Sequence, residues 1–468
     1  MSSFTIETQT WAQRQFGRCH LGDKRRTKRL IKMATQAANH PAGSFPEQVE
    51  AWADLKAAYR LFDARGASFE AIARPHWEQT RHQPAGRYLV LGDTTELDFG
   101  QKRNIPDLGP TGNGRGLGFL LHSGLMVGAE TEEIFGMAGQ TIHYRQPAPK
   151  KENNAQRLKR DRESRIWGDV IDQVGRPPEG TQFVHTLDRG ADNFEVFCHL
   201  RENDADWVVR VAQKHRKIIT PDGAIAVLSE HLATLPVAGT YELSLRAREK
   251  QPARTAKLEV GYGSLAIPVP SHASLYVKEV NSGPIPMGIV WIREVDWPVN
   301  VKPIEWVLYT SLPVKSFDEA WTVISYYEKR WLIEEYHKAL KTGCRVTERQ
   351  LKTKERLEAM VGLMSVVSVR LLQLKSVSRT HPESPAKRYV PARWIAMLQA
   401  VRRNLSPSRE LTLRQFYREL AQLGGFIGRK SDGEPGWITI WRGWEKLHLI
   451  IRGSELTEEL RTKTEKCG

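Results

Sequence analysis

Cysteine is scarce in this sequence. Four occur among 468 residues, and no two of them form a C-x-x-C pair; they are Cys19, Cys198, Cys344 and Cys467. This spacing excludes a disulfide framework and offers no pattern of zinc ligands. The cysteines therefore predict a protein of a reducing compartment.

Long hydrophobic runs are also lacking. The strongly apolar, uncharged run at residues 359–369 is too short to cross a bilayer, and residues 1–15 show no basic segment followed by an apolar one. We expect a soluble cytoplasmic protein without a membrane partner. The hydrophobic content of 40% is nevertheless sufficient for packed cores, and the length suggests roughly three domains.

Acidic residues are too few to balance the basic ones. The 69 Lys and Arg residues exceed the 54 Asp and Glu residues, and the net charge is +15. A chain this basic usually binds a polyanion, most often nucleic acid. No G-x-x-x-x-G-K-[ST] sequence is present, so a nucleotide-binding P-loop is not supported.

The charge imbalance is largest near the N-terminus, where residues 10–70 are predicted to be helical. Asp23 is suited to cap a basic helix, on which Arg25, Arg29 and Lys32 share one face. Such a face is either solvated or in contact with DNA. The near absence of balancing acids favours DNA.

From about residue 86 the pattern changes to strands mixed with helices. Apolar runs predict main-sheet strands at 87–99, 119–127, 132–145, 181–192 and 303–314, and helices at 155–174, 193–203 and 356–375. Residues 207–300 are interpreted as an inserted β subdomain, and residues 375–392 as a linker. The order favours an α/β fold with a mixed sheet.

A long helix is predicted to begin at Ser316 with a capping box and to run to about Gly343. At 100° per residue one stripe of this helix carries Val323, Tyr327, Arg330, Glu334, His337 and Lys341. Glu335 is rotated away from Glu334, so the two acids cannot serve the same site. We expect Glu335 to pair with a cation elsewhere.

Two aspartates lie at the predicted ends of apolar strand segments. Asp93 follows the run YLVLG, and Asp188 follows QFVHTL. A carboxylate there is costly unless it is hydrogen-bonded or binds a metal. Together with Glu334 the two form a set of oxygen ligands suited to Mg²⁺ or Mn²⁺, and two such ions about 4 Å apart can cleave phosphodiesters. Structural salt bridges explain the same acids about as well.

These residues form a familiar pattern. The helix spells Y-x-x-R-x-x-x-E-x-x-x-x-x-x-K, and GDTTELDF, LDRGAD, EWVLYTSLPV and MVGLMSVVSVRLLQL surround it in a fixed order. Over nearly its whole length the chain resembles the insertion-sequence-four family of bacterial cut-and-paste transposases. Several motifs in the right order are far more specific than one.

The resemblance implies a ribonuclease-H-like catalytic core with an inserted β subdomain. It implies an N-terminal helical end-binding domain at 1–70, a catalytic domain at 71–374 with the insertion at about 207–300, and a C-terminal helical dimerisation domain at 375–468. Asp93, Asp188 and Glu334 would be the catalytic, metal-binding triad of a DDE transposase, with two Mg²⁺ or Mn²⁺ ions per site.

The resemblance also implies DNA contacts. The residues concerned are Tyr327, Arg330, Lys338, Lys341, Trp306, Arg210, Arg25, Arg26 and Arg29. Trp306 matches a residue that stacks on a flipped base and stabilises a DNA hairpin, although ordinary strand packing also explains a tryptophan there. For Arg210 a solvated β face is a comparable explanation.

The implied function is cut-and-paste transposition by a homodimer in a synaptic complex with double-stranded DNA. Strand hydrolysis at the transposon end would be followed by hairpin formation, hairpin opening and transfer of the 3′-hydroxyl into target DNA, in the bacterial nucleoid. Two alternatives remain: a catalytically silent end-binding inhibitor and a standalone structure-selective nuclease. A tyrosine recombinase would leave the three acids without a role.

Overall fold

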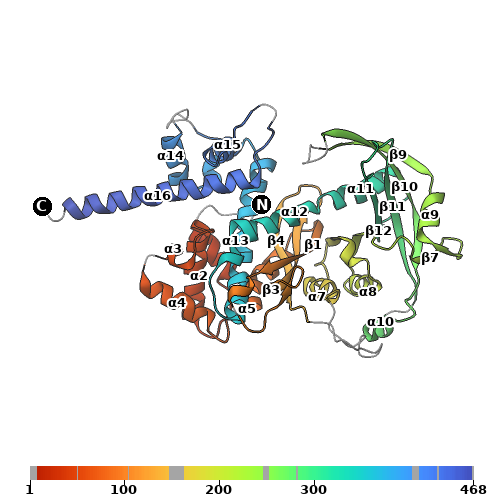
Figure 1. Ribbon diagram of the computed structural model, residues 1–468, viewed down its shortest axis with the longest axis horizontal. Coiled ribbons are helices and arrows are strands. Elements are labelled where there is room, and N and C mark those ends of the chain that lie inside the picture. The colour runs from red at the N-terminus through yellow and green to blue at the C-terminus, as the bar shows by residue number, and fades with distance from the viewer. Residues whose placement is uncertain are drawn as a thin grey trace.

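The computed structural model describes residues 8–49, 51–103, 105–146, 163–245, 252–280, 283–402, 410–429 and 432–465. Figure 1 shows the N-terminal helices packed against one end of a central sheet, and the inserted strands at the other end. The C-terminal helices lie above the N-terminal ones, and the last helix projects away from the molecule.

The N-terminal region is helical, as predicted. Its helices are α1 (Thr8–Phe16), α2 (Lys24–Asn39), α3 (Phe45–Gln48), α4 (Trp52–Phe62) and α5 (Phe69–Arg81). Asp23 is the N-cap of α2, and its carboxylate accepts a hydrogen bond from the backbone N–H of Arg25 at 2.8 Å. Leu30, Ala34 and Ala37 form the buried face of α2, so the basic residues are left on the outside.

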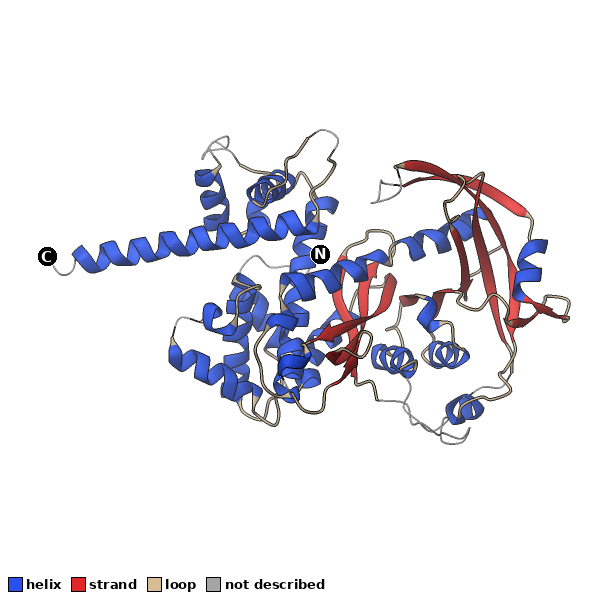
Figure 2. Cartoon of the chain, viewed as in Figure 1, coloured by secondary structure: helices blue, strands red, loops and turns tan. Residues whose placement is uncertain are grey.

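The strands form one continuous twelve-stranded sheet (Figure 2). Its first half contains β1 (Gly86–Asp98), β2 (Gly109–Thr111), β3 (Gly116–Gly128), β4 (Ile134–His143), β5 (Thr181–Leu187) and β6 (Asp206–Arg210). β1 pairs antiparallel with β3 and parallel with β5, and β5 pairs parallel with β6. This is the predicted mixed sheet.

Helices cover both faces of β1. Leu89 and Leu91 belong to the core that contains α5 and α13 (Lys354–Thr380), whereas Val90 packs with α7 (Arg165–Val174) on the other face. This alternation is the two-residue period of a strand buried on both sides. Helix α8 (Phe194–Glu202) follows β5. The predicted helix at 155–174 is observed from Arg165, and residues 155–162 lie outside the described part.

Helix α13 is the core helix of the molecule. Its length and apolar composition would be enough to cross a membrane, but 94% of that apolar window is buried inside the protein. It also continues to Thr380, so the prediction of a linker starting at residue 375 is wrong by one and a half helical turns. Buried contacts of Leu374 and Val377 with the C-terminal helices keep this stretch helical.

The predicted long helix is broken into three parts. Helix α11 (Phe317–Glu328) is followed by α12 (Trp331–Lys338), which passes into a π-helical turn at Ala339–Gly343. At the junction the N–H of Arg330 bonds the carbonyl of Tyr327, a tight i→i+3 contact that interrupts the α-helical pattern. A single α-helical phase from 316 to 343 was therefore an incorrect expectation.

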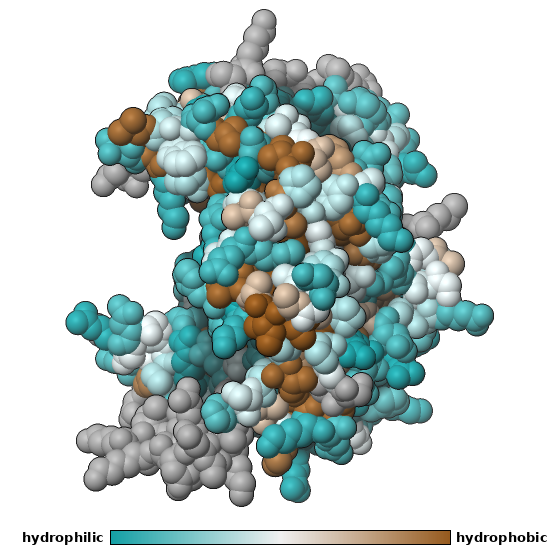
Figure 3. Space-filling model, turned by 90° about the vertical axis from the view of Figure 1, so that its right-hand side faces the viewer, coloured by the Kyte–Doolittle hydropathy of each residue, from teal (hydrophilic) through white to brown (hydrophobic). Residues whose placement is uncertain are grey.

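The insertion extends the main sheet instead of forming a separate one. It contains β7 (Lys217–Ile219), β8 (Ile225–Val227), α9 (Leu228–Thr234), β9 (Val237–Leu245), β10 (Arg254–Ile267), α10 (Leu275–Val280) and β11 (Ile285–Val295). β12 (Glu305–Thr310) pairs with β11 on one side and β6 on the other. β6 thus lies in the main sheet, although the predicted insertion began at its residue 207. Hydrophilic side chains cover much of the face at the insertion end (Figure 3).

The C-terminal region contains α14 (Ala392–Val401), α15 (Leu413–Leu423) and α16 (Trp437–Glu465). Its core includes Trp394, Phe416, Trp444 and Leu447. Further along α16, Leu449, Leu456 and Leu460 are exposed by 64%, 53% and 64%. Their spacing of seven and four residues places them on one stripe of the helix.

Candidate functional site

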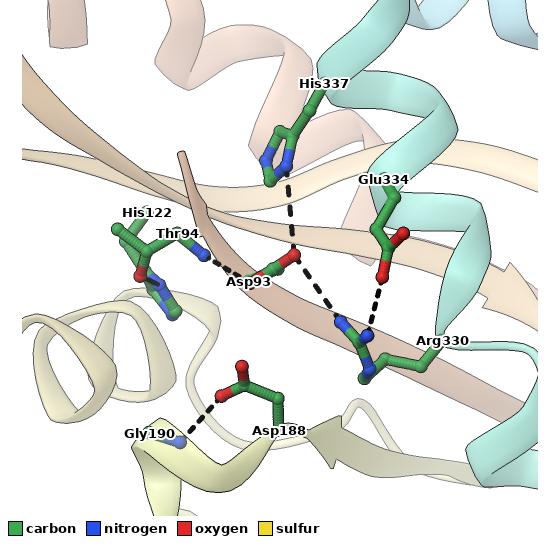
Figure 4. A network of polar contacts seen from close by, with 8 residues as sticks. All are labelled: Asp93, Thr94, His122, Asp188, Gly190, Arg330, Glu334 and His337. Carbon is green, nitrogen blue, oxygen red and sulfur yellow. Dashed lines mark hydrogen bonds and ion pairs between the residues drawn. The ribbon is translucent and has the colours of Figure 1, made fainter. Parts of the chain in front are cut away.

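Asp93 lies at the centre of a polar network (Figure 4). It is in β1, directly after Gly92, which pairs with Leu187 at the end of β5. Asp93 has the same strand parity as Leu89 and Leu91, so its side chain continues the face that packs toward α12 and α13. One carboxylate oxygen accepts the N–H of Thr94 at 2.8 Å, which fixes its orientation.

Asp188 immediately follows β5 and caps the short 3-10 helix Arg189–Ala191. Its Oδ1 accepts the N–H of Gly190 at 2.7 Å. A Cβ atom at Gly190 would come within 3.1 Å of this oxygen and 2.8 Å of the Trp167 ring, so glycine is needed for the close approach. Local turn geometry therefore aims the carboxylate toward Asp93, as Figure 4 shows.

Glu334 comes from the first turn of α12, and Arg330 joins it to Asp93. The guanidinium of Arg330 lies 2.7 Å from Glu334 Oε1 and 3.4 Å from Asp93 Oδ2. Arg330 is 17% exposed, whereas the Glu334 side chain is 49% exposed. A cation thus already occupies the space between two of the three predicted metal ligands.

The acids repel one another electrostatically. Burial raises the pKa of Asp93 to about 6; Arg330 opposes this shift, and the nearby charges of Asp188 and Glu334 add to it. Desolvation and like charges both disfavour a bare carboxylate. A positive ion placed among these three acids would relieve both effects.

His337 also faces Asp93, and sequence reasoning placed it on the Glu334 stripe without giving it a role. Its Nδ1 lies 3.9 Å from Asp93 Oδ2, and its Nε2 has no hydrogen-bond partner within the described part of the chain. Burial, with smaller effects from Lys341, His122 and Arg330, lowers the pKa of His337 to about 3. The ring is therefore neutral. Its position three residues after Glu334 was the sequence signal that could have placed His337 beside the acids.

His122 is a hydrogen-bonded histidine of β3. Its Nδ1 lies 2.8 Å from the hydroxyl of Thr94, and its ring packs edge-on against Trp167. Burial lowers the pKa of His122 to about 3, so it is neutral.

The residues fit a divalent metal by chemistry, but their side chains must move closer together before they can hold one. Three carboxylates without a clustered thiolate are hard oxygen donors of the kind that Mg²⁺ and Mn²⁺ prefer. Across the described ranges, no three His, Cys, Asp or Glu side chains lie close enough together to hold an ion. For Asp93 and Glu334 to share one, Arg330 must first move out from between them.

Two aromatic residues predicted to contact DNA lie beside this network. Trp306 of β12 packs edge-on against Tyr327 of α11 with ring centroids 5.7 Å apart, and Arg330 lies 6.0 Å from the Tyr327 ring. Tyr327 is 6% exposed and Trp306 is partly buried. Part of the Trp306 ring is therefore used in packing against helix α11.

The predicted basic contacts lie at different places. Lys341, in the π turn, has its pKa lowered by burial and raised in part by Glu96 and Asp93. Lys338 is 58% exposed beside Glu335, and Arg210 donates to the backbone carbonyl of Glu305 at 3.3 Å. Lys341 is thus the member of this group nearest the acids.

Four basic residues of α2 make contacts within the protein. Arg29 and Lys32 both pair with Asp54 of α4, at 2.5 and 2.7 Å, while Arg26 donates to the carbonyl of Leu21 at 2.9 Å. Arg25 pairs with Asp23 and its side chain is 90% exposed. Arg25 is the most available of the three arginines predicted to bind a transposon end.

Three family models match successive parts of the chain. One described as transposase DNA-binding matches residues 8–66, one described as transposase DDE domain matches 159–369, and one described as transposase Tn5 dimerisation domain matches 366–463. The chain is a DDE transposase. The transposase thus has a ribonuclease-H-like α/β core between helical N-terminal and C-terminal regions, it cleaves and joins DNA with divalent metal ions, and it acts as a homodimer.

The transposase also has a solved structural neighbour. The cryo-EM structure of a piggyBac transposase synaptic complex with hairpin DNA aligns with 77% of this chain and 67% of that chain, at 11% identity and a TM-score of 0.33.

Proposed function

We propose that this transposase cuts transposon ends through a DNA hairpin at the site formed by Asp93, Asp188 and Glu334. One observation carries the proposal. Carboxylates from β1, the end of β5 and α12 face one another at one edge of the sheet, and a partly buried arginine between Asp93 and Glu334 neutralises part of their charge. A division of the chain into domains at 1–70, 71–374 and 375–468 belongs to the same proposal, with the last boundary moved to the end of α13 at Thr380.

The three acids would hold two Mg²⁺ or Mn²⁺ ions. When bound, such ions activate a water or a 3′-hydroxyl and stabilise the leaving oxygen of a phosphodiester. Asp93 and Asp188 are oriented for this by backbone N–H groups, whereas Glu334 stands on a half-exposed helix turn. The aspartates are thus the fixed part of the site and Glu334 the adjustable part.

Arg330 is proposed to exchange partners when DNA arrives. In this structure its guanidinium bonds Glu334 and lies beside Asp93. A DNA phosphate competes for the same guanidinium, because arginine binds phosphate with paired, charge-assisted hydrogen bonds. The exchange would release both carboxylates at the moment a transposon end is in place. Tyr327 and Lys341, which lie on either side, would hold the same backbone.

Trp306 is proposed to support the hairpin by stacking on a flipped base. Replacing Trp306 with alanine removes this platform, and base stacking on an aromatic residue is worth about 1–3 kcal/mol. We expect the first-strand nick to persist and hairpin product to fall about 5- to 100-fold. Denaturing gels of labelled end DNA, sampled over time, measure both products. Equal loss of nick and hairpin would contradict the role.

The C-terminal stripe of Leu449, Leu456 and Leu460 is proposed to pair the two protomers. These leucines are exposed on a helix that projects beyond the rest of the molecule (Figure 1). Apolar side chains repeating at this spacing are typical of helix pairing. The homodimer would then hold two transposon ends in one synaptic complex, in the bacterial cytoplasm where the chromosome lies.

The test begins with selecting bound DNA ends from a random pool. The selected end is then incubated with the full-length protein and Mg²⁺, with EDTA as control. We expect metal-dependent nicks, hairpins and strand-transfer products, and affinity that falls steeply with salt because phosphate contacts release counterions. Binding without nicking would identify an end-binding inhibitor. Cleavage without joining would identify a nuclease.

A further inference from the structure

A loop with an exposed apolar tip joins β11 to β12. Residues 296–300 are exposed in succession, and they include Trp297 and Val299, with exposed fractions of 49% and 87%. Single exposed apolar residues are ordinary on protein surfaces. Two together on one turn, one of them a tryptophan, form a compact apolar contact surface.

A buried ion pair closes the base of this 296–304 loop. Glu294, with a side chain only 1% exposed, pairs with Arg254 of β10 and accepts the N–H of Ile304 at 2.9 Å. The N–H of Glu294 in turn donates to the carbonyl of Ile304 at 2.8 Å. A buried charge is tolerated only when it is paired and hydrogen-bonded, so these contacts tie the two ends of the loop firmly together.

The tip itself is a defined turn. The N–H of Val301 donates to the carbonyl of Pro298 at 3.1 Å, and Asn300 has the positive φ, 66°, that the third position of such a turn requires. Asp296 also has a positive φ of 58°. With proline at 298 restricting the chain further, Trp297 is presented on a preorganised support.

The loop rises from the edge of the sheet that carries the acids. β12 runs antiparallel to β6, and β6 runs parallel to β5, so the start of β12 lies at the end of β5 that Asp188 follows. From Trp306 the chain leads through Glu305 to the loop. At about 3.4 Å per residue, Ile304 at the end of the loop lies about 7 Å from Trp306.

The surroundings of the loop suit DNA. Lys257, opposite Val295 in β10, and Lys302 within the loop are exposed cations; Asp296 is the acid of the turn. Cations at the base can bind phosphates, while an exposed indole can stack on a base of any sequence. A protein partner would need a larger apolar surface than this tip offers.

We propose that Trp297 stacks on a second base of the DNA held at this edge, beyond the base placed at Trp306. The proposal rests on the proposed function, because it takes the acid edge as the place where the transposon end is cut. Trp297 would hold the strand on the far side of the cleavage point, and Trp306 the base nearer to it.

End DNA carrying 2-aminopurine at successive positions tests this, with full-length protein and Ca²⁺ in place of Mg²⁺ to prevent cleavage. Stacking quenches 2-aminopurine fluorescence. We expect a quenched position that recovers several-fold in Trp297→Ala, stays quenched in Trp297→Phe, and differs from the position that depends on Trp306. Affinity for the end should fall about 5- to 100-fold in Trp297→Ala.

Leu275→Ala is the matched control, because Leu275 is 74% exposed on α10, far from this loop at the bottom of Figure 1. It should change neither fluorescence nor affinity. The proposal is overturned if no position depends on residue 297, or if Trp297→Ala alters only the oligomeric state in light scattering. Cleavage of the same ends by the wild-type protein with Mg²⁺ tests the proposed function independently of Trp297.

Discussion

Glu334→Ala is expected to abolish cleavage of transposon ends while leaving the protein folded and able to bind them. Loss of a metal ligand removes several kcal/mol of transition-state stabilisation, so the cleavage rate should fall about 1,000-fold or more. End binding should be unchanged or slightly tighter, since a negative charge is removed beside the phosphates. Single-turnover cleavage and gel-shift titration measure the two effects.

The half-exposed position of Glu334 makes this test clean. Its ion pair with Arg330 is partly solvated, and such pairs contribute at most about 1 kcal/mol to stability. The melting temperature should therefore stay close to that of the wild type. Asp93→Asn and Asp188→Asn should reproduce the catalytic loss. Cleavage that survives Glu334→Ala would show that this carboxylate is not part of the reaction centre.

Glu335→Ala is expected to have the opposite consequence. Glu335 pairs with Lys375 of α13, and their side chains are only 12% and 6% exposed. Burial acts to raise the pKa of Glu335, but Lys375 and Lys338 outweigh it, so the pKa lies below its usual value. Removing the acid takes away the charge partner of this buried ammonium, and breaking a buried ion pair destabilises proteins by about 3–5 kcal/mol.

The expected result for Glu335→Ala is a clearly lower midpoint in thermal or denaturant unfolding, with cleavage at low temperature retained by the folded fraction. The double variant Glu335→Leu with Lys375→Met should recover most of the loss, because two apolar side chains can replace a buried pair. An unchanged midpoint in the single variant would mean that the pair is solvated in solution. The two adjacent acids would thus have different roles, Glu334 in catalysis and Glu335 in stability.

The different roles expected for Glu334 and Glu335 show how much helical phase alone can predict about the partners of a side chain. Phase predicted that Glu334 and Glu335 serve different sites and that Glu335 pairs with a cation elsewhere, and the Lys375 contact confirms the pairing. It could not identify Lys375, which is 40 residues away and reaches Glu335 only because α13 packs beside α12. It also did not foresee the break at Arg330 or the π turn at Ala339–Gly343.

The sequence by itself determined the parts of this protein that depend on local periodicity and composition. Alternation and apolar runs specified β1, β3, β4 and β5, the Asp23 cap specified the start of α2, and the order of motifs specified a transposase. Asp188 was located because a strand end is a local feature. The expectation of a strand end at Asp93 was wrong, because β1 continues to Asp98 through its pairing with β3.

Only the tertiary structure decided which charges meet. It placed Arg330 between Asp93 and Glu334, joined the insertion to the main sheet through β12, and raised Trp297 at the same edge as Asp188. Ion pairs and sheet edges bring together residues up to hundreds of positions apart, and their energies depend on burial and distance. Neither quantity exists until the chain has folded.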